Sequence, residues 1–206
     1  MPLQMNSSIV AVVISAERLD EICEEAFQSM LEVPDERDPE PGDLWKAARI
    51  LSDYQSRSVS RARGAYTKFG NCLQNIVCLV AKENGRFDVF DEKKPTKKIT
   101  DITIVANDAT YLLFVQSQYN TKNSGAMDEI NGKIQKKSSA KGIIAVVQDY
   151  PPKLDHLSRK QDKAPNVTWL VGPELFKFLS DGDATLYSRL RDAIKRWRKT
   201  NACKFQ

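Results

Sequence analysis

Apolar residues recur at helical spacing in several parts of the chain. Ser15 precedes a stripe of apolar residues three or four positions apart, which predicts an N-capped amphipathic helix. A second stripe between residues 64 and 82 predicts a helix with one buried face. Two further helices are predicted at 173–179 and 186–199. A further helix is predicted at 44–51, so helices are expected near both ends of the chain and between them.

Five short runs between these helices are typical of β-strands. The first three cover residues 87–90, 99–106 and 111–116, and the Asn-Asp pair at 107–108 predicts a hairpin between the last two. A polar helix is predicted at 126–137, followed by "KGIIAVV", a continuous apolar run typical of a strand buried on both faces. "NVTWLVG" predicts the last strand. This order predicts an α/β protein with a mixed β-sheet flanked by helices and an N-terminal helical segment.

The charges divide the chain into two parts. Residues 1–53 contain 4 basic and 12 acidic residues, a net charge of −8, so the rest of the chain carries +12. The stretch "VPDERDPEPGD", with three prolines and a glycine, separates the first helix from the rest of the chain. We expect an acidic helical segment over 1–53 and an α/β core with a basic C-terminal helix over 54–206. The basic core indicates a polyanionic partner, nucleic acid first, with ordinary solvated lysines as the alternative.

The composition argues against several classes of protein. The early apolar run at 9–14 is too short to span a bilayer, lacks a basic flank and leads into acidic residues. We therefore expect a cytoplasmic protein without membrane association. Cys23, Cys72, Cys78 and Cys203 show neither paired metal-ligand spacing nor the density of a disulfide scaffold. They are expected to be small core residues or surface thiols in a reducing compartment.

A polar cluster is predicted where two neighbouring strands end. On "ITDITIVAN", strict alternation places Asp101 on one face, and on the next strand Gln116 and Gln118 share a face. Pairing through the 107–108 turn sets Asp101 beside Gln116, with Lys122 nearby. A carboxylate and amide carbonyls are oxygen ligands of the kind that Mg²⁺ takes, while water and substrate phosphate fill the rest of its shell. We expect a Mg²⁺ site here, with Asp101 and Gln116 as metal ligands.

The order of these stretches resembles the PD-(D/E)xK nuclease superfamily, in particular the type II restriction endonucleases. The resemblance covers about residues 57–195 and joins an opening helix, an Asp-bearing strand, a turn, a catalytic strand, a core strand and a closing strand and helix. The matching stretches are "RARGAYTKFGNCLQNIVCLV", "TDITI", "LLFVQSQYNTKNSG", "KGIIAVV" and "WLVGPELFKFLSDGDATLY". The resemblance implies a restriction-endonuclease-like sheet. It also implies a sequence-specific, Mg²⁺-dependent endonuclease that hydrolyses phosphodiester bonds in double-stranded DNA.

The catalytic strand departs from the family pattern. In that family an Asp and a Glu hold the metal ion, and a Lys two residues after the Glu helps to position the attacking water. Asp101 matches the Asp, but Gln-Ser-Gln at 116–118 stands where Glu-x-Lys is expected, or Phe-Val-Gln at 114–116 if the match shifts by two. Gln74 stands where many relatives have a further Glu, so it is a possible additional active-site residue. Three explanations stay open: a working variant with Lys122 supplying the cation, an engineered inactive form, or a protein that binds DNA without cleaving it.

Two stretches are predicted to contact DNA. After the catalytic strand, Asn, Gln and Lys side chains can bond to base edges and Ser or Thr to bases or backbone, the alternative being a polar connector capped by Ser124. Basic residues before and along the opening helix can reach phosphates, the alternative being a solvated helix face. The expected DNA-binding residues are Arg57, Arg61, Arg63, Lys68, Gln118, Tyr119, Asn120, Thr121, Lys122, Asn123 and Ser124, and the expected catalytic residues are Asp101, Gln116, Gln118 and Lys122.

The resemblance also implies partners. A two-fold enzyme reads a palindromic site and cuts both strands, so we expect a homodimer, with a cognate DNA methyltransferase as genetic partner. The competing hypothesis is a non-catalytic DNA-binding module on the same fold. A weaker third hypothesis is a protein-interaction domain whose acidic N-terminal helix docks a basic partner. The C-terminal stretch "RLRDAIKRWRK" is predicted to be a surface helix and not a binding site.

Overall fold

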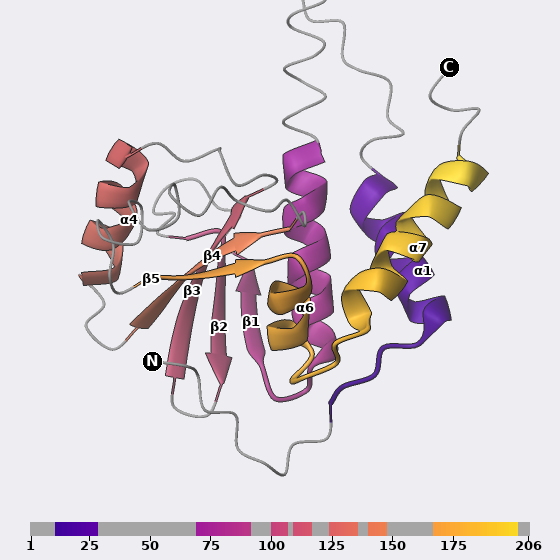
Figure 1. The fold of residues 1–206 in the computed structure, drawn as a ribbon, viewed down its shortest axis with the longest axis horizontal. Coiled ribbons are helices and arrows are strands. Elements are labelled where there is room, and N and C mark those ends of the chain that lie inside the picture. Colours follow the sequence, from indigo (N-terminus) through magenta and orange to yellow (C-terminus); the bar gives the residue numbers. More distant parts are fainter. Residues whose placement is uncertain are drawn as a thin grey trace, which may run out of the picture.

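The computed structural model describes residues 11–28, 69–91, 100–106, 109–116, 124–135, 140–147 and 167–201. These residues form a mixed α/β fold in which a five-stranded sheet lies between helices (Figure 1). The predicted mixed sheet flanked by helices is confirmed, and so is the N-terminal helix. The predicted helix at 44–51 and the proline-rich stretch before it lie outside the described residues.

The strands lie side by side in chain order, β1-β2-β3-β4-β5. Antiparallel pairing joins β1 to β2 and β2 to β3, whereas β3, β4 and β5 are parallel. Their bounds are Asp88–Asp91 for β1, Ile102–Ala106 for β2, Ala109–Gln116 for β3, Ala140–Val146 for β4 and Val167–Val171 for β5. A parallel pair needs a crossover connection, and helix α4 (Ser124–Gln135) lies between β3 and β4 in the chain.

Helices cover both faces of the sheet. The other helices are α1 at Ala16–Phe27, a helix over residues 69–83, α6 at Pro173–Leu179 and α7 at Leu186–Thr200. The 69–83 helix is the unlabelled magenta helix beside β1 in Figure 1, and it lies with α1, α6 and α7 on the side of the sheet away from α4. The predicted helices and strands that fall on the described residues are therefore confirmed, with bounds that differ by a few residues.

Two apolar clusters lie on the two faces of the sheet. The main cluster joins buried residues of α1, the 69–83 helix, α6 and α7 to the sheet through Ile102, Ile104, Leu113, Ile143 and Ala145. The α4 cluster consists of Leu112, Phe114, Ile130, Ile134, Ile144, Val146, Val167 and Trp169. Successive residues of β4 alternate between the two clusters, because side chains of a strand point to opposite faces. The prediction that "KGIIAVV" is buried on both faces is confirmed.

Helix α4 lies very close to β4 at Gly142. A Cβ atom at this position would lie 2.1 Å from Cδ1 of Ile134 and 3.3 Å from Cγ2 of Val167. Any larger residue would therefore push α4 away from the sheet or force Ile134 into another conformation. Glycine is needed here for close approach, and it fixes the position of the crossover helix that follows the candidate site.

The acidic helix α1 packs beside the basic helix α7. Ser15 is the N-cap of α1, as predicted, and its side chain accepts a hydrogen bond from Arg18 N. Asp20 forms an ion pair with Arg196 at 2.8 Å. The Trp197 ring lies 4.8 Å from that of Phe27, and its Nε1 donates to Glu24 Oε2 at 2.8 Å. Trp197 thus packs against α1 and does not form an isolated surface feature.

The buried face of α1 belongs to the main cluster. Leu19, Ile22, Cys23, Ala26 and Phe27 are all buried there. Burial raises the pKa of the Cys23 thiol to about 12, so this cysteine stays protonated near neutral pH. Cys72 and Cys78 are also buried, which confirms three of the four cysteines as core residues. Across the described part of the chain, no helix is long and apolar enough to cross a membrane.

Strand β2 begins later than predicted. The sequence predicts a strand from residue 99, but the regular ladder starts at Ile102. At Asp101 the chain bends. The N–H of Asp101 still bonds to Leu113 O, but the Thr100 hydroxyl and the Asp101 carboxylate make further hydrogen bonds to β3 through side chains. Strict alternation therefore does not extend to Asp101, and the position of its side chain is set by specific contacts instead.

Candidate functional site

Asp101 lies at the open end of the β2–β3 hairpin. The two strands pair as predicted, and the ladder ends with Ile102 opposite Leu113. One more main-chain hydrogen bond follows, from Asp101 N to Leu113 O at 3.1 Å. The hydroxyl of Thr100 donates to the same carbonyl. These two bonds hold the chain just before β2 against β3, which fixes the backbone that carries Asp101.

The carboxylate of Asp101 is held by β3. Its Oδ2 accepts a hydrogen bond from the main-chain N–H of Val115 at 2.7 Å. In a regular antiparallel ladder such an N–H bonds to a main-chain carbonyl, so here a side chain replaces a backbone acceptor. Hydrogen bonds to an ionised acceptor are short and strong, and this one orients the carboxylate. Asp101 is therefore fixed beside the residue that precedes Gln116.

Gln116 is the last residue of β3 and is 7% exposed. Its Nε2 donates to Val115 O at 3.0 Å, and its main-chain carbonyl accepts from Val147 N at 3.0 Å. Phe114, two residues earlier, packs in the α4 cluster. Gln116 is therefore the polar side chain that β3 brings to this end of the sheet.

Gln74 reaches the same place from the 69–83 helix. Its Nε2 donates to the main-chain carbonyl of Asp101 at 3.3 Å. Neighbouring Leu73 and Ile76 are buried in the main cluster and fix the helix against the sheet. Gln74 thus reaches the main chain of residue 101 from one face of the sheet, whereas Gln116 shares the α4 face of β3 with Phe114.

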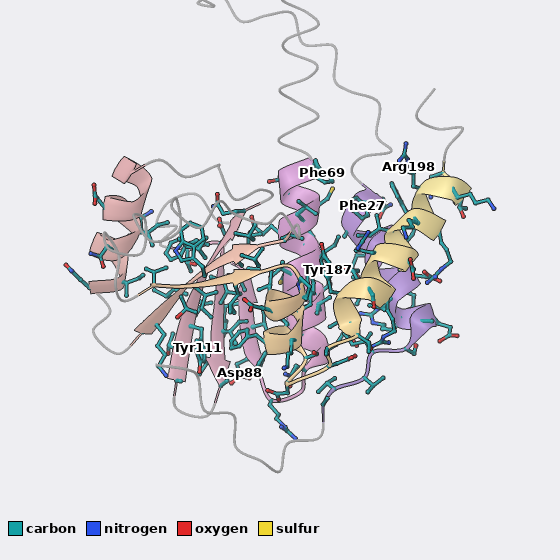
Figure 2. All side chains as sticks on the ribbon, in the orientation of Figure 1. Phe27, Phe69, Asp88, Tyr111, Tyr187 and Arg198 are labelled. Atoms are coloured by element: carbon teal, nitrogen blue, oxygen red, sulfur yellow. The ribbon has the colours of Figure 1, made fainter. Side chains whose placement is uncertain are left out.

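The site faces one end of the sheet. Figure 2 labels Asp88 and Tyr111 at the opposite end of the strands, and Phe69, the first described residue of the 69–83 helix, lies at the other end of the molecule. Since β3 runs from Tyr111 toward Gln116, the candidate site lies on the side of Phe69. Asp101 and Gln74 are partly exposed there.

The side chains at this site offer oxygen atoms as metal ligands, and only one of these side chains carries a formal charge. Asp101 offers a carboxylate, and Gln116 and Gln74 each carry an amide carbonyl. These donors fit Mg²⁺, which usually takes one or two carboxylates and keeps several waters. Among the described residues, no group of three or more His, Cys, Asp or Glu side chains is placed to hold a metal ion. A metal at this site would therefore be completed by water and substrate phosphate.

Most of the predicted DNA-binding residues lie outside the described residues. This applies to Arg57, Arg61, Arg63, Lys68, Gln118, Tyr119, Asn120, Thr121, Lys122 and Asn123. Helix α4 begins at Ser124, so the polar tract leads directly into the crossover helix. The structure thus brings together Asp101 and the residue next to Gln116, and adds Gln74 to them.

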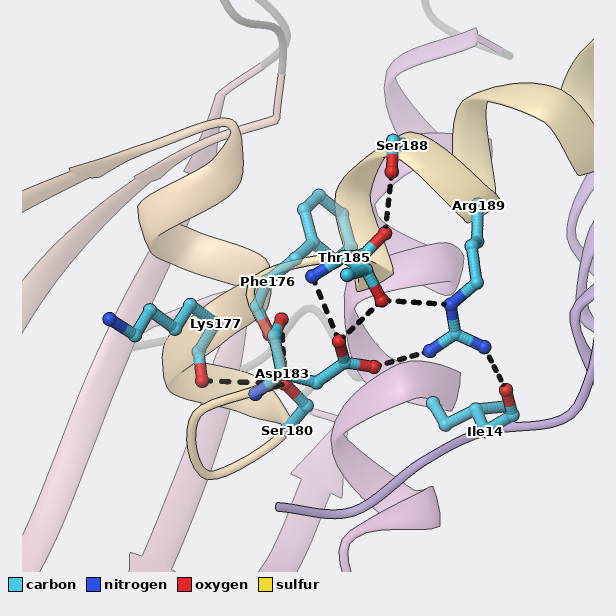
Figure 3. Close-up of polar contacts among 8 residues, drawn as sticks. All are labelled: Ile14, Phe176, Lys177, Ser180, Asp183, Thr185, Ser188 and Arg189. Atoms are coloured by element: carbon cyan, nitrogen blue, oxygen red, sulfur yellow. Dashed lines mark hydrogen bonds and ion pairs between the residues drawn. The ribbon is translucent and has the colours of Figure 1, made fainter.

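A second polar cluster, the Asp183 network, lies between α6, α7 and the segment before α1 (Figure 3). Oδ1 of Asp183 accepts from Thr185 N at 2.8 Å and from Thr185 Oγ1 at 2.7 Å. Arg189 donates to Asp183 Oδ2 and to the carbonyl of Ile14. Ser180 Oγ accepts from Asp183 N at 3.1 Å. The network ties the N-terminal segment to the start of the C-terminal helix.

The electrostatics of the Asp183 network indicate a structural role. Burial alone would raise the pKa of Asp183, but hydrogen bonds from Thr185 and Arg189 and the guanidinium charge outweigh burial and lower it. Both carboxylate oxygens accept hydrogen bonds from these neighbours. Sequence reasoning missed this network, although Asp183 and Thr185 just before a predicted helix are residues that commonly cap helices.

Comparison with known proteins adds no relative: no protein-family model matches the chain, and no curated protein matches its sequence.

Proposed function

We propose that this protein is a Mg²⁺-dependent, sequence-specific endonuclease that hydrolyses phosphodiester bonds in double-stranded DNA, in the manner of type II restriction enzymes. The observation that supports it is the arrangement at one end of the sheet, where Asp101 bonds to Val115 N–H next to Gln116 and Gln74 bonds to the carbonyl of Asp101. They come from a helix, an Asp-bearing strand start and the second strand of a hairpin, the order that the resemblance to the PD-(D/E)xK superfamily implies. The +12 charge of the chain after residue 53 suits a polyanionic substrate.

Each residue has a role in this proposal. Asp101, held by Val115 N–H, and the side-chain carbonyl of Gln116 would hold the metal ion. A bound Mg²⁺ lowers the pKa of water and neutralises charge that builds on the scissile phosphate. Gln74 keeps the main chain of Asp101 in place, and Gln118 or Lys122 positions the attacking water.

Recognition of DNA is assigned to the tract after β3. Asn120 and Asn123 suit adenine edges, because an amide can bond bidentately to adenine, and Lys122 suits guanine or phosphate. Arg57, Arg61, Arg63 and Lys68 contact phosphates. In the same proposal the enzyme is a cytoplasmic homodimer, and a DNA methyltransferase encoded nearby protects the host DNA.

The test is digestion of unmethylated phage DNA by the purified protein with Mg²⁺ or Mn²⁺. We expect discrete fragments that disappear in EDTA, because a sequence-specific enzyme cuts at fixed positions. DNA that stays intact over a wide range of both metal ions, with protein that is folded by circular dichroism, contradicts cleavage.

A second candidate function is DNA binding without cleavage. One observation favours it: of the three side chains at the site, only Asp101 carries a charge, whereas the resembling nucleases have a second acid and a lysine. An amide carbonyl is a weaker metal ligand than a carboxylate. Under this alternative the protein binds duplex DNA with a steep salt dependence, yet leaves plasmid intact. Gel-shift and plasmid assays on the same preparation distinguish the two functions.

A further inference from the structure

Helix α7 carries more positive charge than the fold uses. It contains six basic residues and one acidic residue, a net charge of +5. Two of the six have structural partners, because Arg189 belongs to the Asp183 network and Arg196 pairs with Asp20 of α1. The other four basic side chains are exposed to solvent: Arg191, Lys195, Arg198 and Lys199. Most of the positive charge of α7 therefore plays little part in holding the fold together.

Three of these four side chains line one face of α7. Arg191, Lys195 and Arg198 follow one another at spacings of four and three residues, so they are neighbours on the helix surface, and we call them the α7 stripe. The Arg191 guanidinium lies 5.9 Å from the centroid of the Tyr187 ring, a contact that holds it at the surface. Asp192 pairs with Lys195 at 3.0 Å, but both side chains are more than half exposed, so water screens this pair. The stripe therefore keeps a positive field toward solvent.

The α7 stripe points away from the acidic helix α1. The buried residues Leu186, Leu190 and Ala193 face the main cluster. Arg196 and Trp197 bond to carboxylates of α1, so the side of α7 that carries them faces that helix. Since successive residues turn by about 100° around a helix axis, positions 191, 195 and 198 fall on the remaining, solvent side. The acids of α1 therefore do not cover the stripe.

The α7 stripe also runs toward the end of the molecule that carries the candidate site. In Figure 2, Arg198 lies toward the same end as Phe69, whereas Asp88 and Tyr111 lie toward the opposite end. Strand β3 ends at Gln116 on the Phe69 side. The last turns of α7 and the candidate site are therefore both at this end of the molecule.

We propose that the α7 stripe binds the phosphate backbone of duplex DNA beside the bases that the protein reads. The inference rests on the proposed function, in that it takes DNA as the ligand, and it adds a binding surface on α7. The sequence pattern alone predicts a surface helix without a binding role, because it does not show which cations the fold uses. Arginine and lysine donate charge-assisted hydrogen bonds to phosphate oxygens, and such contacts position a duplex without reading its sequence.

The size of the effect follows from the release of counterions. One phosphate contact gives affinity a salt dependence with a slope of about −0.9 on logarithmic axes, which amounts to roughly eightfold between about 0.1 and 1 M salt. Three contacts multiply to roughly 500-fold. Lys199, exposed beside the stripe, offsets part of the loss when the stripe is removed. We therefore expect a variant without the stripe to bind at least about 30-fold more weakly at about 0.1 M salt.

The experiment measures the affinity of the full-length protein for a fluorescent mixed-sequence duplex of about 30 base pairs, roughly three helical turns, by anisotropy. EDTA keeps the probe intact, and KCl is varied between about 0.05 and 0.2 M. The triple variant Arg191→Gln, Lys195→Gln, Arg198→Gln should lose at least about 30-fold in affinity near the middle of this range, and its salt slope should be shallower by about 2 to 3. Glutamine is close to arginine and lysine in helix propensity, so α7 should stay folded.

A second triple variant is the matched control. Lys82→Gln, Lys141→Gln, Lys177→Gln removes the same charge from three exposed lysines at the opposite end of the sheet. Lys141 is the β4 partner of Tyr111, Lys177 precedes Phe178, whose ring contacts Tyr111, and Lys82 lies at the end of the 69–83 helix away from its start. Charges this far from the bound duplex are largely screened, so the control should bind within about threefold of the wild type.

Two single variants compare neighbouring arginines of the same helix. Arg198→Gln should weaken binding by roughly threefold to eightfold, because it removes one phosphate contact. Arg196→Gln should change binding less, because Arg196 faces α1 and pairs with Asp20. This pair of variants answers the question if the triple variant fails to fold.

The outcomes separate this inference from the proposed function. A folded stripe variant with the affinity and salt slope of the wild type overturns the inference, and so do equal losses in the stripe and control variants. Discrete fragments from phage DNA would still leave the proposed function standing in either case. Conversely, a loss that is confined to the stripe variant supports the inference even if the wild type leaves phage DNA uncut. Wild-type protein that does not bind the duplex at low salt overturns both the inference and the DNA-binding alternative.

Discussion

The candidate site and the Asp183 network are both polar clusters built around one aspartate, yet they differ in what surrounds that aspartate. Asp183 is 8% exposed, and its two oxygens are matched by Thr185 and by the guanidinium of Arg189. Asp101 lies at a strand end, bonded to the main chain of β3 and accompanied by two amides. A buried carboxylate paired with a cation stabilises the fold, whereas the partly exposed carboxylate of Asp101 is the one that we propose meets a ligand.

This difference gives a criterion for telling a structural polar cluster from a ligand site. The Asp183 network closes on itself between segments that are far apart in the chain, from Ile14 to Arg189. Changes there should affect stability and leave DNA binding alone. Changes at the site should affect cleavage. Variants of both clusters test this separation, beginning with the variant that should raise activity most.

The largest gain in activity is expected when the family pattern is restored. The double variant Gln116→Glu with Gln118→Lys should raise the cleavage rate by about 100-fold, because it adds a second carboxylate ligand and a cation near the attacking water. Its melting temperature should fall in EDTA and recover with Mg²⁺, since a buried carboxylate is compensated only by the metal. A plasmid-nicking time course measures the rate. A folded double variant that binds DNA but does not cleave it would show that the catalytic residues lie elsewhere.

Removing the carboxylate of the Asp183 network should affect stability instead. Asp183→Ala leaves Arg189 and Thr185 without their acceptor, so we expect a loss of about 2 kcal/mol in the free energy of unfolding. Urea denaturation measures it. The matched control is Asp192→Ala, because Asp192 is an exposed aspartate of α7 whose ion pair with Lys195 should contribute little. Equal losses for the two variants, or weaker DNA binding by Asp183→Ala, would contradict the separation of roles.

A change at Gln74 should affect both stability and cleavage. Gln74→Ala removes the hydrogen bond to the carbonyl of Asp101, so a loss of about 1 kcal/mol in unfolding free energy is expected. Cleavage should fall about tenfold as well, because small displacements of a catalytic group are costly. Gln135→Ala, at the exposed end of α4, should change neither quantity. Unchanged cleavage by Gln74→Ala would make this residue purely structural.

The smallest effect concerns pH. The pKa of Asp183 is lower in the folded protein than its ordinary value near 4, so the group stabilises the fold above that value. This contribution is lost as the pH falls through the folded pKa. The free energy of unfolding of the wild type should therefore fall more steeply below about pH 4 than that of Asp183→Asn. Urea titrations across this range provide the measurement, and parallel curves for the two proteins would contradict the pairing.

Much of the fold can be predicted from the sequence because its signals are local. The alternation and the turn pair around 107–108 predict the hairpin, and the apolar run of β4 predicts a strand buried on both faces. The pairing of α1 with α7 is not predicted, since it depends on contacts such as Asp20 with Arg196 between residues 176 positions apart. The late start of β2 is missed for a similar reason, because Asp101 bonds to Val115 through its side chain.

The candidate site is predictable in part. Hairpin pairing predicts that Asp101 lies close to the end of β3, and the structure places its carboxylate on Val115. The bond from Gln74 to the carbonyl of Asp101 has no signature in spacing, because it joins a helix to a strand start 27 residues later. The Asp183 network shows the same limit, since Arg189 finds its partners only once α7 is folded onto the N-terminal segment.

The role of Asp101 is decided by the rates at which the wild type and Asp101→Asn cleave supercoiled plasmid at the same Mg²⁺ concentration. Asparagine keeps an oxygen that can accept from Val115 N–H, so the melting temperature should stay unchanged. The charge on the metal ligand is lost, so cleavage should fall by at least about 1,000-fold. Cleavage by Asp101→Asn at the wild-type rate would show that the end of the β2–β3 hairpin is not the active site.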